Sequence, residues 1–271
     1  MSFKIAYCAG HHLGNPKGVP KSMGLGDIRE WTINDQVARH FAEAASQYEG
    51  VETLRTDDPT GKTLIDIPER CAAANEWGAD VYIDMHHNAG IEGGTGGGAV
   101  AFYRPKDARS EAYANAIYDA VIAAGGLRGN RYDTVIAKNW LTMKHSEADA
   151  VLMEYGFMDS KVDAPIIVTD AYSKLVAYAT MGGIAKVVGL KNKKTMEVCK
   201  VDLPILNKGD KGEAVKAMQG LLELRGFPCG KGATGNFGNG TESAVKKFQK
   251  SNKIKETGCC NEKTWKELLG V

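Results

Sequence analysis

Short apolar segments alternate with helix-like segments along residues 1–188. The segment Val81–Met85 is nearly continuous in apolar residues, as expected for a strand that is covered on both faces. Elsewhere apolar residues recur at helical spacing, as at Ile33, Val37 and Phe41. This alternation predicts an α/β domain with a mostly parallel, twisted sheet that is flanked by helices. The predicted strands are Phe3–Ala9, Val51–Arg55, Val81–His86, Ala99–Tyr103, Thr134–Ala137 and Ala150–Tyr155, and further helices are predicted at Leu64–Trp77, Ser110–Ala124 and Ala171–Val188.

The pattern changes near residue 189. Residues 189–203 are rich in lysine and lack periodicity, and Pro204 follows them, so this stretch is predicted to be an exposed linker. Beyond it, apolar stripes predict a small all-α domain of three helices over residues 204–271, with Thr241 as the N-cap of the second helix. These helices are predicted at Glu213–Leu224, Thr241–Ser251 and Thr264–Leu269. The expected division is therefore a first domain over 1–188, a linker over 189–203 and a second domain over 204–271.

Composition and charge narrow the function classes. Of the 271 residues, 43% are hydrophobic and 25% are charged, which is usual for globular proteins. The formal net charge is only +1, so no broad positive field for nucleic acid or an anionic membrane is expected. No apolar run is long enough to span a membrane, so membrane insertion is not expected either. The N-terminus has the pattern of a strand rather than of a secretory signal, so we expect synthesis and initial folding in the cytoplasm.

The cysteines and the glycine-rich run indicate little chemistry of their own. Six cysteines are too few for a disulfide scaffold and none forms a C-x-x-C pair, so most are expected to be reduced and structural. Whether Cys229 pairs with Cys259 or Cys260 stays open. Within and just after the run Gly90–Gly98, residues 94–99 fit G-x-G-x-x-A formally, but they lead into a strand, so no dinucleotide site is predicted. A mobile loop beside the functional site and a plain flexible connection are both compatible with it.

Four of the six histidines stand in two adjacent pairs, and each pair closes a predicted strand. The pairs are His11–His12 and His86–His87. Functional groups of an α/β sheet gather at the carboxyl ends of its strands, so the two pairs are expected to converge on one metal ion. Imidazole suits zinc, and a carboxylate is the expected third ligand. Because neighbouring residues of a strand point to opposite faces, at most one histidine of each pair should bind the ion. The alternative is that these histidines are only polar residues at strand ends.

Two glutamates occupy positions that suit chemistry. Glu30 opens the first predicted helix, where the helix dipole alone also favours a carboxylate. Glu154 lies within the otherwise apolar strand AVLMEYGF, where an ionised carboxylate is costly unless it is paired or lies beside a metal. We therefore predict that Glu154 acts as a general acid/base. Cys8 lies inside a strand and is predicted to be a small core residue rather than a nucleophile.

Several motifs follow one another along residues 4–188. They are CAGHH at residues 8–12, Glu30, Arg70, Asn75, Ala79, Asp80, DMHHNA at 84–89, GGAVAFY at 97–103 and VLMEYGFMDSKVD at 151–163. In their order and spacing these motifs resemble those of the zinc-dependent N-acetylmuramoyl-L-alanine amidases known as amidase type 3. The usual pattern of that family has Asp, Gly, Ser and Asn where this sequence has Cys8, His12, Asp84 and Ser160.

The resemblance implies a metal site and a reaction. It implies that zinc is the cofactor and that its ligands are His11, Glu30 and His86, which selects one histidine from each pair. It also implies that Glu154 is the catalytic carboxylate. The implied activity is hydrolysis of the amide bond between N-acetylmuramic acid and L-alanine of peptidoglycan by zinc-activated water. The roles of His12 and His87 remain open.

The C-terminal segment contains LNKGDKGEAVKAMQ at residues 206–219, GNFGNGTESAVKKFQ at 235–249 and Thr264–Trp265. In these motifs it resembles the type 1 peptidoglycan-binding domain. We therefore expect a two-domain peptidoglycan hydrolase, and a phage or prophage endolysin that reaches the wall through a holin pore or by lysis. A spore-associated hydrolase is the second role. Two other functions stay in view: a zinc peptidase that acts within the stem peptide, and a non-catalytic wall-binding protein.

Overall fold

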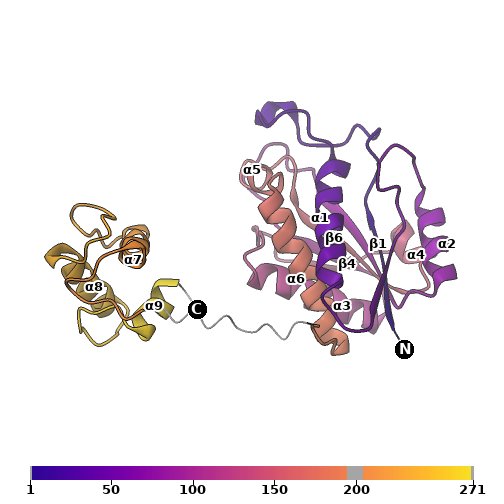
Figure 1. Cartoon of the computed structure of the whole chain (residues 1–271). Helices are drawn as coiled ribbons and strands as arrows, with labels where there is room; N and C mark the ends of the chain where they lie inside the picture. The colour runs from indigo at the N-terminus through magenta and orange to yellow at the C-terminus, as the bar shows by residue number, and fades with distance from the viewer. Residues whose placement is uncertain (1, 194–203, 270–271) are drawn as a thin grey trace. The chain divides into compact units, whose positions relative to one another are not determined.

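A computed structural model of the protein describes residues 2–193 and 204–269 (Figure 1). The chain divides into two compact units, residues 1–195 and 196–271. Within the stretch predicted as a linker, the backbone of Lys191 and Lys193 bonds to Glu49 and Gln47 of the first unit. The predicted linker residues 194–203 lie outside the described residues. No helix in the described part of the chain is both long enough and apolar enough to cross a membrane.

The first unit is built on a six-stranded sheet with the strand order β2-β1-β3-β6-β4-β5. Neighbouring strands pair in parallel except β4 and β6, which pair antiparallel. All six predicted strands are present, and the predicted mostly parallel α/β sheet is confirmed. The strands are β1 (Phe3–Ala9), β2 (Val51–Arg55), β3 (Val81–Asn88), β4 (Val100–Tyr103), β5 (Val135–Ala137) and β6 (Asp149–Phe157).

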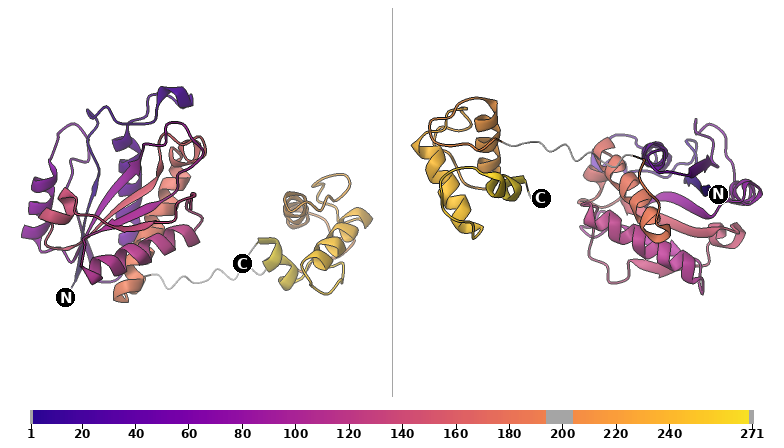
Figure 2. Two further views of the ribbon diagram at one scale, coloured as in Figure 1. Left: turned by 180° about the vertical axis from the view of Figure 1, so that it is seen from behind. Right: turned by 60° about the horizontal axis from the view of Figure 1, so that its bottom comes forward.

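Helices cover both faces of this sheet (Figures 1 and 2). One face packs against α1 (Glu30–Ala45), α3 (Ala108–Ala123) and α6 (Asp170–Val188). The other face packs against α2 (Ile67–Trp77) and α4 (Leu141–His145). Because alternate residues of a strand point to opposite faces, positions 82, 84 and 86 of β3 share the α2 side and position 87 takes the α1 side. The shorter helices of this unit are a 3-10 helix at Lys21–Met23 and α5 (Ala164–Ile167).

Helix α2 begins at Ile67 rather than at the predicted Leu64. Asp66 is its N-cap and accepts a hydrogen bond from the backbone N–H of Glu69 at 2.9 Å. The Glu69 carboxylate in turn accepts from the backbone N–H of Asp66, which completes a capping box. Pro68 in the first turn favours the same start. Hydrogen bonds of the capping side chains therefore determine where α2 begins, and this start cannot be predicted from the spacing of apolar residues.

The described part of the second unit contains the three predicted helices, α7 (Glu213–Leu224), α8 (Asn239–Ser251) and α9 (Glu262–Leu269). Their apolar faces form one core that includes Met218, Phe248 and Trp265. The prediction that Thr241 is the N-cap of the second helix is wrong, because α8 begins at Asn239. The pairing of Cys229, which the sequence leaves open, is absent among the described residues, whose cysteines are free. These are Cys8, Cys71, Cys229, Cys259 and Cys260, while Cys199 lies outside the described residues.

Two buried glutamines tie helices of the second unit to the loops that follow them. Gln219 of α7 accepts a hydrogen bond from the backbone N–H of Gly235 at 2.8 Å and donates one to the Thr241 hydroxyl at 2.9 Å. Gln249 of α8 makes the same two kinds of contact with the next loop and the next helix. Its partners are the N–H of Gly258 and the hydroxyl of Thr264, both at 3.0 Å.

Replacement of Gln249 by Ala is expected to destabilise the second unit. The side chain is fully buried, and its loss leaves the N–H of Gly258 without a partner, at a cost of about 1–3 kcal/mol. Hydrogen-exchange mass spectrometry of the full chain should show faster exchange in peptides from residues 239–269 and unchanged exchange in the first unit. The control is Lys247→Ala, an exposed position on the same helix. Equal protection in the two variants would contradict the assigned role.

Candidate active site

The carboxyl ends of β1 and β3 lie side by side. These strands pair in parallel with Ala9 opposite Met85, and the Gly10 N–H continues the pairing with a 2.8 Å bond to the Met85 carbonyl. His11 follows directly on one strand and His86 lies near the end of the other. Their rings meet edge to face with centroids 4.9 Å apart. The structure therefore brings together one histidine from each pair.

The turn that carries His11 has little freedom. His11 itself has a φ of 67°, in the left-handed region that non-glycine residues rarely adopt. The buried guanidinium of Arg70 holds this turn by donating to the carbonyls of Ala9 and His11 at 2.9 and 2.6 Å. Gly10 is required as well, because a β-carbon at this position would overlap the ring of His86. Close backbone approach thus allows the two histidines to meet.

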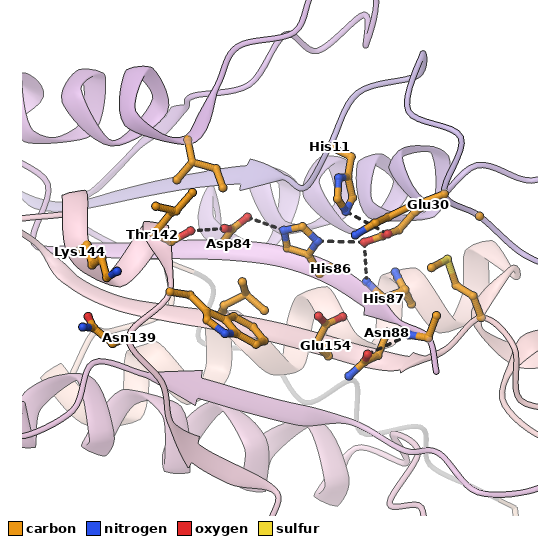
Figure 3. Close-up of a pocket in the computed structure, with 18 residues that line it drawn as sticks. His11, Glu30, Asp84, His86, His87, Asn88, Asn139, Thr142, Lys144 and Glu154 are labelled. Atoms are coloured by element: carbon orange, nitrogen blue, oxygen red, sulfur yellow. Dashed lines mark hydrogen bonds and ion pairs between the residues drawn. The ribbon is translucent and has the colours of Figure 1, made fainter. Parts of the chain in front are cut away.

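Glu30 lies between the two histidines (Figure 3). One carboxylate oxygen is 2.9 Å from His86 Nδ1 and the other is 3.0 Å from His11 Nε2. One ligand atom from each of the three residues lies within 4.8 Å of the others. Two imidazoles and a carboxylate form a donor set that zinc binds in catalytic sites, with a fourth position left for water or substrate. The three residues therefore fit a metal ion of this kind.

Burial and hydrogen bonding shift the pKa values of Glu30 and His86 in opposite directions. Burial alone would raise the pKa of Glu30, but the hydrogen bonds from His11 and His86 outweigh it and lower the pKa below its usual range. Burial alone would lower the pKa of His86, but the carboxylates of Asp84 and Glu30 raise it well above its ordinary value. Glu30 is therefore ionised at neutral pH, as a metal ligand must be.

Glu154 reaches the cluster from β6. In the parallel pairing of β3 with β6 it stands opposite His86, on the same face of the sheet. Glu154 is 8% exposed, and its Oε2 has no hydrogen-bond partner among the described residues. Burial raises its pKa to about 8; the charge of His86 opposes this shift, and the charge of Glu30 adds to it. A buried carboxylate with a free oxygen beside the cluster can accept and return a proton.

The second histidine of each pair has other surroundings. His87 points to the α1 side, where its Nδ1 lies 2.8 Å from Asn34 Oδ1. Burial lowers the pKa of His87 to about 3, so its ring is neutral. His12 does not belong to the ligand cluster, and its Nδ1 has no hydrogen-bond partner among the described residues. His11 and His86 thus lie with Glu30 in the cluster, and His12 and His87 lie outside it.

A cleft of about 670 Å³ opens over the cluster and Glu154 (Figure 3). Its lining includes residues that sequence reasoning did not identify, among them Lys17, Trp140 and Lys144. The Trp140 ring is 39% exposed and packs on Phe102 with ring centroids 4.3 Å apart. The cleft thus offers an aromatic surface and two cations beside the metal-binding cluster. No sequence pattern identified these residues. Trp140 and Lys144 reach the cleft because of the path that the chain takes from β5 into α4, and this path has no periodic signature.

The glycine-rich run Gly90–Gly98 is bonded to two aspartates and does not line the cleft. One oxygen of Asp159 accepts hydrogen bonds from three consecutive backbone N–H groups, at residues 90, 91 and 92, at 2.8–2.9 Å. Asp163 accepts another from Gly98 at 2.7 Å. The cleft lining reaches Ala89, and the described residues 90–98 are not part of it. Carboxylates that follow β6 therefore hold this loop in place.

Comparison with known proteins decides the family. Residues 5–186 match the family of N-acetylmuramoyl-L-alanine amidases. The chain belongs to this family. Residues 211–268 match a peptidoglycan-binding domain. Both resemblances predicted from the sequence are thereby confirmed, and so is the predicted class of enzyme, a peptidoglycan amidase.

Two relatives of the chain come from species of Bacillus. The sporulation-specific N-acetylmuramoyl-L-alanine amidase of Bacillus subtilis (strain 168) is 29% identical over 187 residues, which cover 68% of this chain and 69% of that protein. The N-acetylmuramoyl-L-alanine amidase CwlM of Bacillus licheniformis is 27% identical over 184 residues, which cover 67% of each chain.

Solved structures show the same amidase fold. The catalytic domain of CwlV from Bacillus (Paenibacillus) polymyxa var. colistinus superposes with a TM-score of 0.61 at 21% identity, covering 70% of this chain and 99% of that one. The N-acetylmuramoyl-L-alanine amidase of Clostridium difficile 630 superposes with a TM-score of 0.62 at 23% identity, covering 69% and 97%.

Glu154→Gln is expected to change how the stability of the metal-free amidase depends on pH. The pKa of Glu154 is raised from 4.5 to about 8 in the fold, so its contribution to stability is complete below pH 4.5 and is lost as the pH rises towards 8. The variant cannot ionise here. Calorimetry should therefore show it melting above the wild type at pH 8, with a difference that shrinks towards pH 5. The exposed Glu76→Gln serves as control, and a pH-independent difference for Glu154→Gln would refute the assigned pKa.

Proposed function

We propose that the protein hydrolyses the amide bond between N-acetylmuramic acid and L-alanine of peptidoglycan, with a zinc ion held by His11, Glu30 and His86. The observation that carries this proposal is the position of this donor set beside Glu154, whose buried Oε2 has no hydrogen-bond partner among the described residues. Zinc, when bound at such a site, supplies Lewis-acid polarisation of the amide carbonyl and makes water more acidic.

Glu154 acts first as general base and then as general acid. In its ionised form it accepts a proton from the water that attacks the amide carbonyl. In its protonated form it returns that proton to the nitrogen of the departing L-alanine. The pKa of Glu154 is about 8 without a cation, and a positive charge in the cluster lowers it, because the charge stabilises the carboxylate. A bound cation therefore favours the ionised form, which accepts the proton.

We further propose that residues 204–271 bind the cell wall, while residues 1–188 carry the catalytic machinery and 189–203 join them. The match of residues 211–268 to a peptidoglycan-binding domain supports this division. Attachment to an insoluble polymer keeps the enzyme at a high effective concentration of its substrate, so wall binding raises the rate without any contact to the reacting bond.

For the biological role, we propose a phage or prophage endolysin that gains access to the wall when the cell lyses. The name of the B. subtilis relative favours a hydrolase of sporulation as the second candidate. Immunoblots of the source organism, taken after prophage induction and during sporulation, separate the two roles. Accumulation only in sporulating cells would overturn the endolysin proposal.

Digestion of purified peptidoglycan should produce new N-terminal L-alanine. Amine labelling before acid hydrolysis, followed by chiral analysis of the labelled residue, measures this product. New reducing sugar ends would identify a glycosidase instead. A labelled residue from further along the stem peptide would identify a zinc peptidase, and either result would overturn the proposed bond.

Glu154→Gln should reduce the rate of wall lysis by about 10²–10⁴-fold, because it removes the proton acceptor but keeps the shape of the side chain. Turbidity loss of cell-wall suspensions measures lysis, and pelleting with walls measures binding, which should be unchanged. Glu76→Gln, at an exposed position of α2, should lyse walls at the wild-type rate. Wild-type lysis by Glu154→Gln would exclude the proposed mechanism, and a wild type that binds walls without lysing them would favour a non-catalytic protein.

A further inference from the structure

We propose that Asp84 is a positioning residue of the metal centre, which holds His86 from the side opposite Glu30 and directs Nδ1 of the ring towards the ion. This inference rests on the proposed function, because it assigns a role towards the same ion. The contacts that support it lie within the chain itself.

The two nitrogens of His86 face two different carboxylates (Figure 3). Nδ1 is 2.9 Å from Glu30 Oε1, within the cluster, and Nε2 is 3.1 Å from Asp84 Oδ1, outside it. A carboxylate at Nε2 accepts the N–H there, which leaves the lone pair of Nδ1 to a metal. The contact therefore selects both the tautomer and the orientation of the ring.

Asp84 is itself fixed from two further elements. The hydroxyl of Thr142, in α4, donates to Oδ2 at 2.6 Å, and the thiol of Cys8, in β1, donates to Oδ1 at 3.0 Å. The hydroxyl of Tyr82 donates in turn to Cys8 Sγ at 3.2 Å. Asp84 is 3% exposed, so water does not compete for these bonds. Cys8 thus has a defined task as a donor, which is consistent with its prediction as a core residue.

The spacing of two residues in β3 makes this arrangement possible. Asp84 and His86 point to the same face of the sheet, so the carboxylate lies next to the ring along the strand. The sequence pattern marked Asp84 only as a departure from a usual serine. A serine hydroxyl is shorter and uncharged, so it supports a neighbouring imidazole less strongly than a carboxylate does.

The same contact joins the ligand to the wall of the cleft. Thr142 lies in the first turn of α4, next to Leu141 and close to Trp140 and Lys144, which line the cleft. The row Thr142, Asp84, His86 and Glu30 is continuous in hydrogen bonds and ion pairs (Figure 3). The orientation of His86 is therefore tied to the position of this wall.

The test measures zinc affinity rather than activity. Competition with a chromophoric chelator gives the zinc Kd of the full chain. Asp84→Asn keeps the shape but removes the charge, and should weaken binding by about 10–100-fold. Thr142→Val keeps Asp84 but removes the shortest of its hydrogen bonds, and should weaken binding by a smaller factor. The control is Thr180→Val, a buried threonine of α6 that bonds to Tyr155 and Val176 away from the cluster, where the zinc Kd should not change.

The outcomes separate this inference from the proposed function. A wild type that does not bind zinc would contradict the proposed metal centre. A wild type that binds zinc, with the same Kd in Asp84→Asn, would overturn the positioning role and leave the metal centre intact. If Asp84→Asn fails to fold, judged by its circular dichroism without metal, Thr142→Val decides: a Kd equal to that of Thr180→Val would overturn the inference. The visible spectrum of the cobalt-loaded protein gives a second readout, since a reoriented His86 should alter it.

Discussion

The parallel pairing of β1, β3 and β6 determines where the functional groups of the amidase lie. These strands run the same way at the centre of the sheet, so their carboxyl ends meet at one edge. His11 leaves the first strand there, while His86 and Glu154 stand opposite each other on the other two. Both faces of the sheet are buried under helices, which makes these strands rigid. The metal-binding cluster therefore forms at this edge of the sheet, where Gly10 and Arg70 allow the turn after β1 to bring His11 next to His86.

A concentration of buried carboxylates in this place is costly for the fold. Glu30, Asp84 and Glu154 all lie below 9% exposure, and like charges at such distances repel strongly where water is scarce. Two of them are compensated by His86, which stands between Glu30 and Asp84. The Oε2 of the third, Glu154, has no hydrogen-bond partner in the described part of the chain, and the cost of burying this carboxylate appears as its raised pKa. The fold thus compensates the two carboxylates that face His86 and leaves Glu154 as the group from which a proton can move.

Much of this arrangement is readable from the sequence, because it depends on local pattern. The six strands follow from apolar runs, and the rule that strand neighbours point to opposite faces already limits each histidine pair to one ligand. The same rule places Asp84 beside His86, but its role depends on Thr142, 58 residues away along the chain. Trp140 and Lys144 were missed for a related reason, since the path of the turn before α4 is not encoded in any periodicity.

The antiparallel pairing of β4 with β6 also depends on contacts between segments that are far apart in the sequence. The start of α2 and the role of Thr241 depend on single side-chain bonds, which composition and spacing do not report.

The paired glutamines of the second unit have a consequence for its architecture. Gln219 lies in the middle of α7 and Gln249 near the end of α8, and each bonds to the N–H of a glycine in the next loop and to the hydroxyl of a threonine in the first half of the following helix. The domain is therefore two overlapping copies of one helix–loop–helix unit. Helix α8 belongs to both copies, because it supplies Thr241 to the first and Gln249 to the second. Neither copy is complete without the shared helix, so this small domain is expected to unfold as a whole and not by halves.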